Sequence, residues 1–82
     1  MRVPNLSRHR QAPALIALGK AIREAREARM MSQEALSLAA DVDVSYVGRV
    51  ERGDNNVAIL TLLKLTKALE LTLAELAASA EL

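Results

Sequence analysis

The sequence predicts an all-α fold, a single domain built from five helices. From Pro13 onward, apolar residues recur at steps of three and four, as they do on the buried face of a helix. Residues that suit helix caps stand before several of these stretches. The valines between residues 42 and 50 could suggest a strand, but their spacing mixes two and three and the neighbouring caps favour a helix. A chain of 82 residues is expected to form one domain.

The first helix is expected at about residues 13–29. Pro13 suits the first helical turn, where its missing N–H group is not needed. The apolar face of this helix is formed by Leu15, Leu18, Ile22 and Ala25. Residues 1–12 show no apolar period and carry arginines without any acid, so we expect a flexible basic N-terminal arm before a folded domain at residues 13–82.

Each of the other helices is expected to begin after a residue whose side chain can accept a hydrogen bond from a backbone N–H. The expected helices cover about residues 33–40, 44–52, 57–69 and a fifth segment from 73 onward. Their expected caps are Ser32, Asp43, an asparagine and Thr72. Thr72 and Glu75 have the spacing of a capping box, and Gly53 suits the left-handed residue that follows a helix.

The composition excludes several classes of site. The chain has no Cys and one His, with no carboxylate near that His in sequence, so neither a metal nor another cofactor is expected. No apolar run approaches the ~18 residues of a membrane span, and no export signal is evident, which favours a cytoplasmic protein. Because no catalytic triad, carboxylate pair or phosphate-binding glycine loop is evident, we expect no enzyme and no small-molecule ligand.

The charges are distributed unevenly along the chain. The net charge is only +1, but residues 1–31 carry seven Lys or Arg and two Glu, whereas residues 32–82 carry four Lys or Arg and eight Asp or Glu. Such an asymmetry can present one basic face to a polyanion. The alternative is that these charges are simply solvated.

The segment SQEALSLAADVDVSYVGRVERG at residues 32–53 breaks after two helical turns and restarts at once. Two short helices joined by a tight turn, with the apolar Val42 inside it, are the layout of a helix-turn-helix. Packing of the first helix across the second pushes one face of the second outward. A helix is about 10–12 Å wide with its side chains and fits a major groove about 12 Å wide.

These residues resemble the phage-repressor type of helix-turn-helix, the XRE family. The resemblance spans about residues 15–76. The positions in register are Gln33, Leu36, Ala40, Val42, Val47, Val50, Glu51, Gly53 and Leu62. It implies a five-helix phage-repressor-like DNA-binding domain whose second and third helices form the motif. The small size is similar to that of stand-alone members such as restriction–modification controller proteins.

The chain departs from the family at three positions where glycine is frequent, occupied here by Met30, Asp41 and Glu70. Aspartate adopts the left-handed conformation more readily than most residues. Met30 and Glu70 would each cost about 1 kcal/mol if the same backbone is kept. The alternative is that the backbone shifts at these positions.

We expect the exposed face of the helix at 44–52 to read base edges. Its candidate reading residues are Val44, Ser45, Tyr46, Gly48 and Arg49. Arg49 is the first choice, because a guanidinium can donate two hydrogen bonds to a guanine. Val44 offers only apolar contact, for example to a thymine methyl. Tyr46 could instead pack on the preceding helix, Gly48 could merely fill a gap, and Arg49 could be solvated.

Phosphate contacts would fix the position of the protein on a duplex. The candidate residues are Ser32, Gln33, Arg52, Asn55 and Asn56, with Arg2, Arg8 and Arg10 of the arm. The resemblance implies that the amide of Gln33 binds a phosphate and braces a side chain of the next helix. It also implies an ion pair between Arg26 and Glu51, to which we assign a structural role.

The fourth and fifth helices carry more leucines than one buried stripe needs. One face of the fourth helix has Ile59, Leu62, Thr66 and Leu69. The candidate dimer interface consists of Leu60, Leu63, Leu71, Leu73, Leu76 and Ala77. An apolar surface wider than the core usually marks an interface, and a two-fold pair is the commonest assembly. The alternative is that these leucines over-fill a monomer core.

The sequence therefore predicts a transcriptional regulator that binds double-stranded DNA sequence-specifically. It is expected to act as a homodimer on a palindromic operator, with the helix at 44–52 in the major groove and about 34 Å between the two copies. A protein-interaction module with the same fold, such as an antitoxin, is the alternative.

Overall fold

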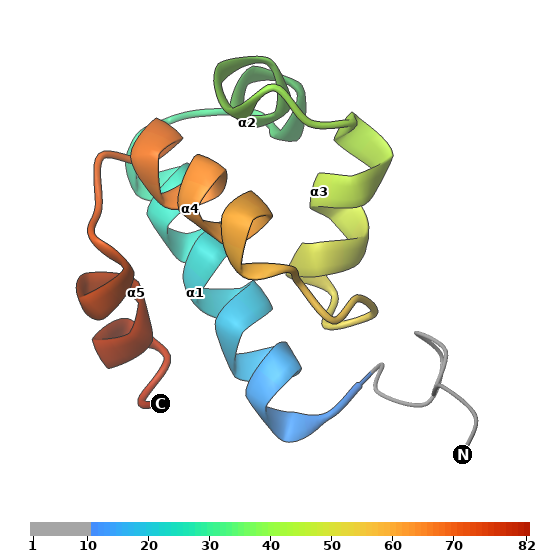
Figure 1. Ribbon diagram of the computed structural model, residues 1–82. Helices are drawn as coiled ribbons and strands as arrows, with labels where there is room; N and C mark the ends of the chain where they lie inside the picture. Colours follow the sequence, from blue (N-terminus) through green and yellow to red (C-terminus); the bar gives the residue numbers. More distant parts are fainter. Residues whose placement is uncertain (1–10) are drawn as a thin grey trace.

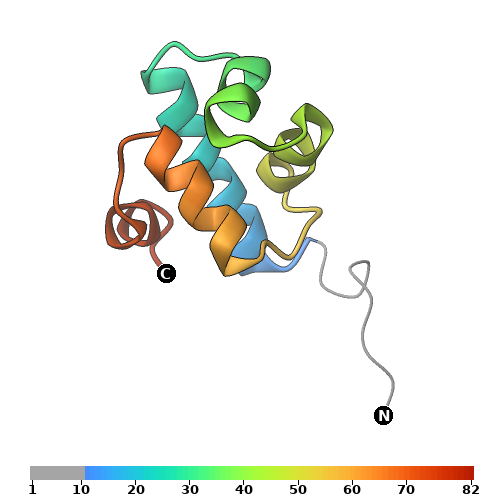
Figure 2. The same ribbon diagram turned by 45° about the horizontal axis from the view of Figure 1, so that its top comes forward.

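The computed structural model describes residues 11–82 (Figure 1). The helices are α1 (Pro13–Ala28), α2 (Gln33–Ala40), α3 (Val44–Glu51), α4 (Ile59–Ala68) and α5 (Leu73–Ser79). This part of the chain contains no strand, which confirms the all-α prediction. The long α1 runs through the middle, with α3 on one side and α5 on the other (Figures 1 and 2). Helix α2 packs on both α3 and α4.

Two of the expected helix caps are present. Ser32 Oγ accepts a hydrogen bond from the N–H of Ala35 at 3.0 Å, at the start of α2. At the start of α5, Thr72 Oγ1 accepts from the N–H of Glu75 at 3.0 Å, and Glu75 Oε1 accepts from the N–H of Thr72 at 2.8 Å. These caps satisfy N–H groups that a helix leaves without an internal partner.

Of the other two expected caps, Asp43 is confirmed in its position only, and the asparagine before α4 is wrong. Asp43 occupies the N-cap position of α3, but its carboxylate makes no capping hydrogen bond. Helix α4 begins at Ile59, two residues later than expected, and its N-cap is Ala58 rather than an asparagine. The reason is tertiary: Asn55 is buried within the loop that leads from α3 to α4, so the chain reaches its helical conformation only after this loop.

Every helix contributes to the hydrophobic core. The largest side chains that are completely buried are Ile22, Leu36, Val47, Val50, Leu65, Leu69 and Leu76. The face of α4 predicted from the sequence is buried at Leu62, Thr66 and Leu69, and Leu65 is buried with them, whereas Ile59 is 56% exposed. Leu76 is 0% exposed within the single chain, so its assignment to a dimer interface is wrong.

Gly19 allows α1 and α3 to approach closely. A Cβ atom added at Gly19 would lie 2.7 Å from the carbonyl oxygen of Glu51 and closer still to that of Val50. Glycine inside a helix costs about 1 kcal/mol relative to alanine. Here this cost permits backbone-to-backbone packing, which holds the C-terminal half of α3 against the central helix.

The three positions that usually carry glycine in the family keep the left-handed backbone. The φ angles are 57° at Met30, 58° at Asp41 and 57° at Glu70. After α1, the N–H of Met31 donates to the carbonyl of Arg26 at 3.1 Å, and that of Met30 donates to the carbonyl of Glu27 at 2.9 Å. These two bonds form a Schellman motif, so the chain accepts backbone strain to satisfy the last carbonyls of the helix.

Replacing Met30 with glycine is expected to stabilise the protein by up to about 1 kcal/mol, because glycine adopts a positive φ without strain. The Met30 side chain is 94% exposed, so its removal sacrifices almost no buried surface. In a domain of this size, 1 kcal/mol corresponds to a rise of about 4–8 °C in Tm. Met30→Ala is the matched control, because it removes the same side chain but keeps the Cβ atom. Equal melting temperatures for the two variants would contradict the strain at this position.

Candidate nucleic-acid interface

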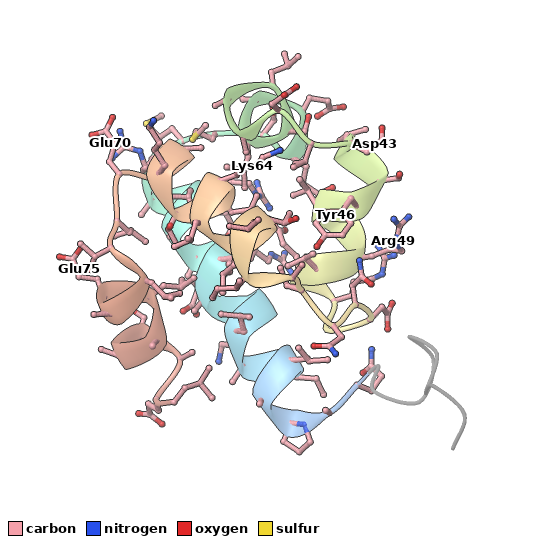
Figure 3. All side chains as sticks on the ribbon, viewed as in Figure 1. Asp43, Tyr46, Arg49, Lys64, Glu70 and Glu75 are labelled. Carbon is pink, nitrogen blue, oxygen red and sulfur yellow. The ribbon has the colours of Figure 1, made fainter. Side chains whose placement is uncertain are left out.

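Helix α3 presents one face to solvent. Its inner residues Val47 and Val50 are buried against the rest of the domain. Ser45 and Arg49 are exposed, and Val44 is 39% exposed. Arg49 points outward from α3 in Figure 3, away from the body of the domain. No other segment of residues 11–82 covers this face, so a duplex can reach it.

Tyr46 and Arg49 contact each other on α3. The guanidinium carbon of Arg49 lies 5.8 Å from the centroid of the Tyr46 ring, within the range of a cation–π interaction. The ring is half-buried between α3 and α4. Burial raises the pKa of the Tyr46 hydroxyl, and a hydrogen bond with Thr61 and the charge of Arg49 partly offset this rise. The hydroxyl is therefore protonated at neutral pH.

Gly48 lies beneath neighbouring side chains, and its assignment as a base-reading residue is wrong. It is buried, and a Cβ atom there would lie 3.2 Å from Nη1 of Arg52 and 3.7 Å from Oε1 of Gln33. The absence of a side chain leaves room for Gln33. The amide nitrogen of Gln33 donates to Oε1 of Glu51 at 3.0 Å, so the first residue of α2 braces the last residue of α3.

Arg26 and Glu51 form a two-point ion pair between α1 and α3. Nε of Arg26 lies 2.7 Å from Oε2 of Glu51, and Nη2 lies 3.0 Å from Oε1. Nη1 of Arg26 donates to the carbonyl of Met31 at 2.8 Å. The two side chains are only 11% and 3% exposed. The hydrogen bond to Glu51 raises the pKa of Arg26, although burial opposes this effect, so the guanidinium remains charged.

The candidate phosphate ligands differ in how accessible they are. Ser32 and Asn56 are exposed, although the Ser32 hydroxyl also caps α2. Arg52 is exposed and pairs with Asp54 at 3.1 Å. Asn55 lies in the loop before α4 and is only 5% exposed, so its assignment as a phosphate ligand is wrong. Arg2, Arg8 and Arg10 lie outside the described residues.

Gln11 makes hydrogen bonds with the end of the α3 region that the sequence did not predict. Its backbone N–H donates to the carbonyl of Gly53 at 2.6 Å, and its side-chain amide donates to the carbonyl of Arg52 at 3.0 Å and to the carboxylate of Asp54. These bonds join positions about 40 residues apart, so no local pattern predicts them. They fix the start of the described chain beside the C-terminal end of α3.

The candidate interface residues fall into two groups. Leu60 and Leu63 on α4 are 72% and 43% exposed, and the neighbouring Ile59 is also exposed. Leu71, Leu73 and Ala77 are half-buried. Leu60 and Leu63 are three residues apart and share a face of α4 that no element of residues 11–82 covers.

Within residues 11–82, no group of His, Asp and Glu side chains could hold a metal ion. None of the helices in this range combines the length and the apolar character needed to cross a bilayer. The outer face of α3, which carries Arg49, is accessible in this part of the chain.

The profile of the helix-turn-helix family matches residues 22–76, which include all of α2, α3 and α4. No curated protein sequence matches the chain. Among solved structures, the restriction–modification controller protein C.AhdI from Aeromonas hydrophila is 45% identical, with a TM-score of 0.74, over 76% of this chain and 94% of that chain.

Two other similar structures are also those of regulatory proteins. The clp gene regulator ClgR from C. glutamicum is 28% identical, with a TM-score of 0.81, over 83% of this chain and 87% of that chain. The controller protein C.Esp1396I is 25% identical, with a TM-score of 0.77, over 83% of this chain and 88% of that chain. The family match and the likeness to these regulators agree with the exposed α3, and the chain belongs to the XRE-type helix-turn-helix family of DNA-binding regulators.

Proposed function

We propose that the protein is a transcriptional regulator that binds double-stranded DNA sequence-specifically as a homodimer. Helix α3 enters the major groove, and two copies of α3 read the halves of a palindromic operator. The observation that carries this proposal is the exposed outer face of α3, on which Arg49 has no acidic partner within residues 11–82. An arginine in this position can donate two N–H groups from one edge of its guanidinium to O6 and N7 of a guanine.

The position of α3 supports the proposal. Gln33, Glu51 and Arg26 link the start of α2, the end of α3 and the end of α1 through charge-assisted hydrogen bonds of 2.7–3.0 Å. Such bonds are among the strongest that side chains make. A reading helix held in this way loses little conformational freedom on binding, which favours affinity.

Phosphate contacts are proposed for Ser32 and Gln33 at the start of α2, and for Arg52 and Asn56 near the start of α4. The first N–H groups of a helix are unpaired donors at the positive end of its dipole and suit a phosphate. The proposed arm contacts of Arg2, Arg8 and Arg10 fall outside the described residues. They would continue from Gln11, which is fixed beside the end of α3.

The proposed dimer uses Leu60 and Leu63 of α4, together with the half-buried Leu71, Leu73 and Ala77. Large apolar side chains on one exposed helix face are costly for a monomer and are usually covered by a partner. The comparisons support the DNA-binding part of the proposal, since C.Esp1396I has been solved as a nucleoprotein complex and ClgR is described as a gene regulator.

Replacing Arg49 with alanine is expected to remove a guanine preference from each half of the operator. The loss of a bidentate contact costs about 1–3 kcal/mol, which is about 5- to 150-fold in affinity per half-site. The measurement is selection of bound duplexes from a random pool at fixed salt, for the wild type and the variant. The wild type should enrich a two-fold symmetric site that contains this guanine.

Arg29→Ala is the matched control. It removes the same charge from the end of α1, where Arg29 pairs with Glu70 at 2.9 Å, far from Arg49 (Figure 3). This variant should enrich the same site as the wild type. If the wild type enriches no duplex at low salt, the proposed function is wrong. If Arg49→Ala enriches the same bases as the wild type, the role of Arg49 is wrong.

A further inference from the structure

Arg49 and Arg52 are both exposed arginines of the α3 region, but their surroundings differ. Arg52 donates through Nε to the carboxylate of Asp54 at 3.1 Å, so this edge of its guanidinium is occupied. Arg49 forms no ion pair within the described residues, and its guanidinium contacts the Tyr46 ring. A ring face holds a guanidinium by its flat surface and leaves the N–H groups at its edge available.

We propose that Tyr46 is a positioning residue for Arg49, and that Thr61 of α4 in turn holds Tyr46. The base preference of the protein then depends on a contact between α3 and α4, as well as on the side chain that touches the base. This inference rests on the proposed function, because it assigns a supporting structure to the arginine that would read the operator.

The physical reason is the freedom of an exposed arginine. An arginine side chain has about 2 kcal/mol of rotamer entropy, part of which must be lost when it binds one base edge. Contact with the Tyr46 ring restricts the Arg49 side chain before DNA arrives. The ring suits this role because it is half-buried and itself has little freedom. Tyr46 is also the only aromatic residue of the chain, so no other ring could replace it.

Thr61 completes the arrangement. It is half-buried on α4 and lines the same hollow as Tyr46, where its hydroxyl partly offsets the rise in the pKa of Tyr46. Val42, Asp43, Tyr46, Arg49 and Thr61 line an open hollow of about 290 Å³ between α3 and α4. The Tyr46 hydroxyl is thus directed toward α4. In this proposal Tyr46 does not donate its hydroxyl to a base, as the sequence predicted; instead its ring orients Arg49.

The test measures base discrimination, defined as the ratio of Kd values for two operators. One is the operator selected by the wild type, and the other carries adenine in place of the guanine assigned to Arg49. Tyr46→Leu removes the ring and should lower this ratio about two- to fivefold, the range of an exposed cation–π contact. A purely structural role would weaken binding to both operators equally and leave the ratio unchanged.

Two conservative variants test the hydroxyl pair. Tyr46→Phe keeps the ring, and Thr61→Val keeps the shape of the side chain; each should lower the ratio by less than Tyr46→Leu does. A double variant that combines Tyr46→Phe with Thr61→Val should lower the ratio by no more than one of these changes alone, because both remove the same contact between the two hydroxyls. Thermal melting of each variant identifies any variant that fails to fold. If Tyr46→Leu does not fold, Thr61→Val still tests the proposal.

The outcomes separate this inference from the proposed function. If Arg49→Ala lowers the ratio but Tyr46→Leu and Thr61→Val do not, Arg49 reads the base without support, and only the positioning role is overturned. If Arg49→Ala itself leaves the ratio unchanged, the assignment of Arg49 in the proposed function fails and the positioning role fails with it. A lower ratio in Tyr46→Leu, with smaller and non-additive losses in the two conservative variants, supports the inference.

Discussion

Replacing Arg26 with alanine is expected to lower the free energy of unfolding by about 3–5 kcal/mol. The Glu51 side chain is only 3% exposed, and Arg26 supplies two of the hydrogen bonds that its carboxylate accepts. Without Arg26, this buried charge would keep only the hydrogen bond from Gln33. Small domains have a total stability of about 5–15 kcal/mol, so this loss would remove a large part of the stability of the fold. Thermal and denaturant unfolding measure the loss.

Arg23→Ala is the matched control for this prediction. Arg23 lies on the same helix and also pairs with a glutamate, Glu27, at 3.2 Å, but the two side chains are 62% and 54% exposed. Exposed pairs at this spacing contribute about 0.3–0.5 kcal/mol. If Arg26→Ala melts at the temperature of Arg23→Ala, the buried pair has no special structural role.

A second variant separates the charge from the packing. The double substitution of Arg26 by Met and Glu51 by Leu replaces the pair with apolar side chains of similar size. Buried pairs replaced in this way often leave stability unchanged or increased, because no charge remains to be desolvated. We therefore expect the double variant to recover most of the stability that Arg26→Ala loses. The amide of Gln33 would lose its acceptor, so this recovery is expected to be incomplete.

The sequence predicted the helices well where local signals determine them. Ser32 caps α2 and Thr72 and Glu75 cap α5 through bonds that span three residues, so nearby residue types suffice to predict them. The start of α4 was misplaced because its expected asparagine cap was judged from residue type alone. In the folded chain Asn55 is buried in the loop before α4, and the helix begins only at Ile59.

At the candidate site, too, the features that depend on local sequence were predicted and those that depend on tertiary contacts were not. The face of α3 that carries Arg49 could be predicted from helical periodicity and from the family resemblance. The burial of Gly48 could not, because it depends on how Gln33 of α2 lies across α3. The role of Gly19 also depends on a partner, the backbone of α3. A glycine inside an otherwise regular helix was nevertheless a usable signal, since its cost usually has a packing reason.

Replacing Leu60 and Leu63 together with aspartate is expected to convert the protein to a monomer and to weaken its binding to a full operator. Both leucines are exposed in the single chain, at 72% and 43%, so the substitutions should leave the fold intact. In a two-fold dimer, each protomer would bring two new negative charges into the same apolar contact, where the partner brings two more. Sedimentation should give a mass near 8.9 kDa for the variant and about twice this value for the wild type.

The effect on DNA binding follows from linkage of the two reading helices. In a dimer, binding of one half-site makes the second binding event intramolecular, which can raise the overall affinity by about 10²–10⁴ over one half-site. The double variant should lose this gain on a two-fold operator yet keep its affinity for a single half-site.

Leu38→Asp is the matched control, because Leu38 is 83% exposed on α2, outside the proposed interface. A wild type that sediments as a monomer at micromolar concentration, or a double variant that remains a dimer, would contradict the proposed interface. Retention of half-site binding by a monomeric double variant would show that α3 reads DNA independently of the dimer.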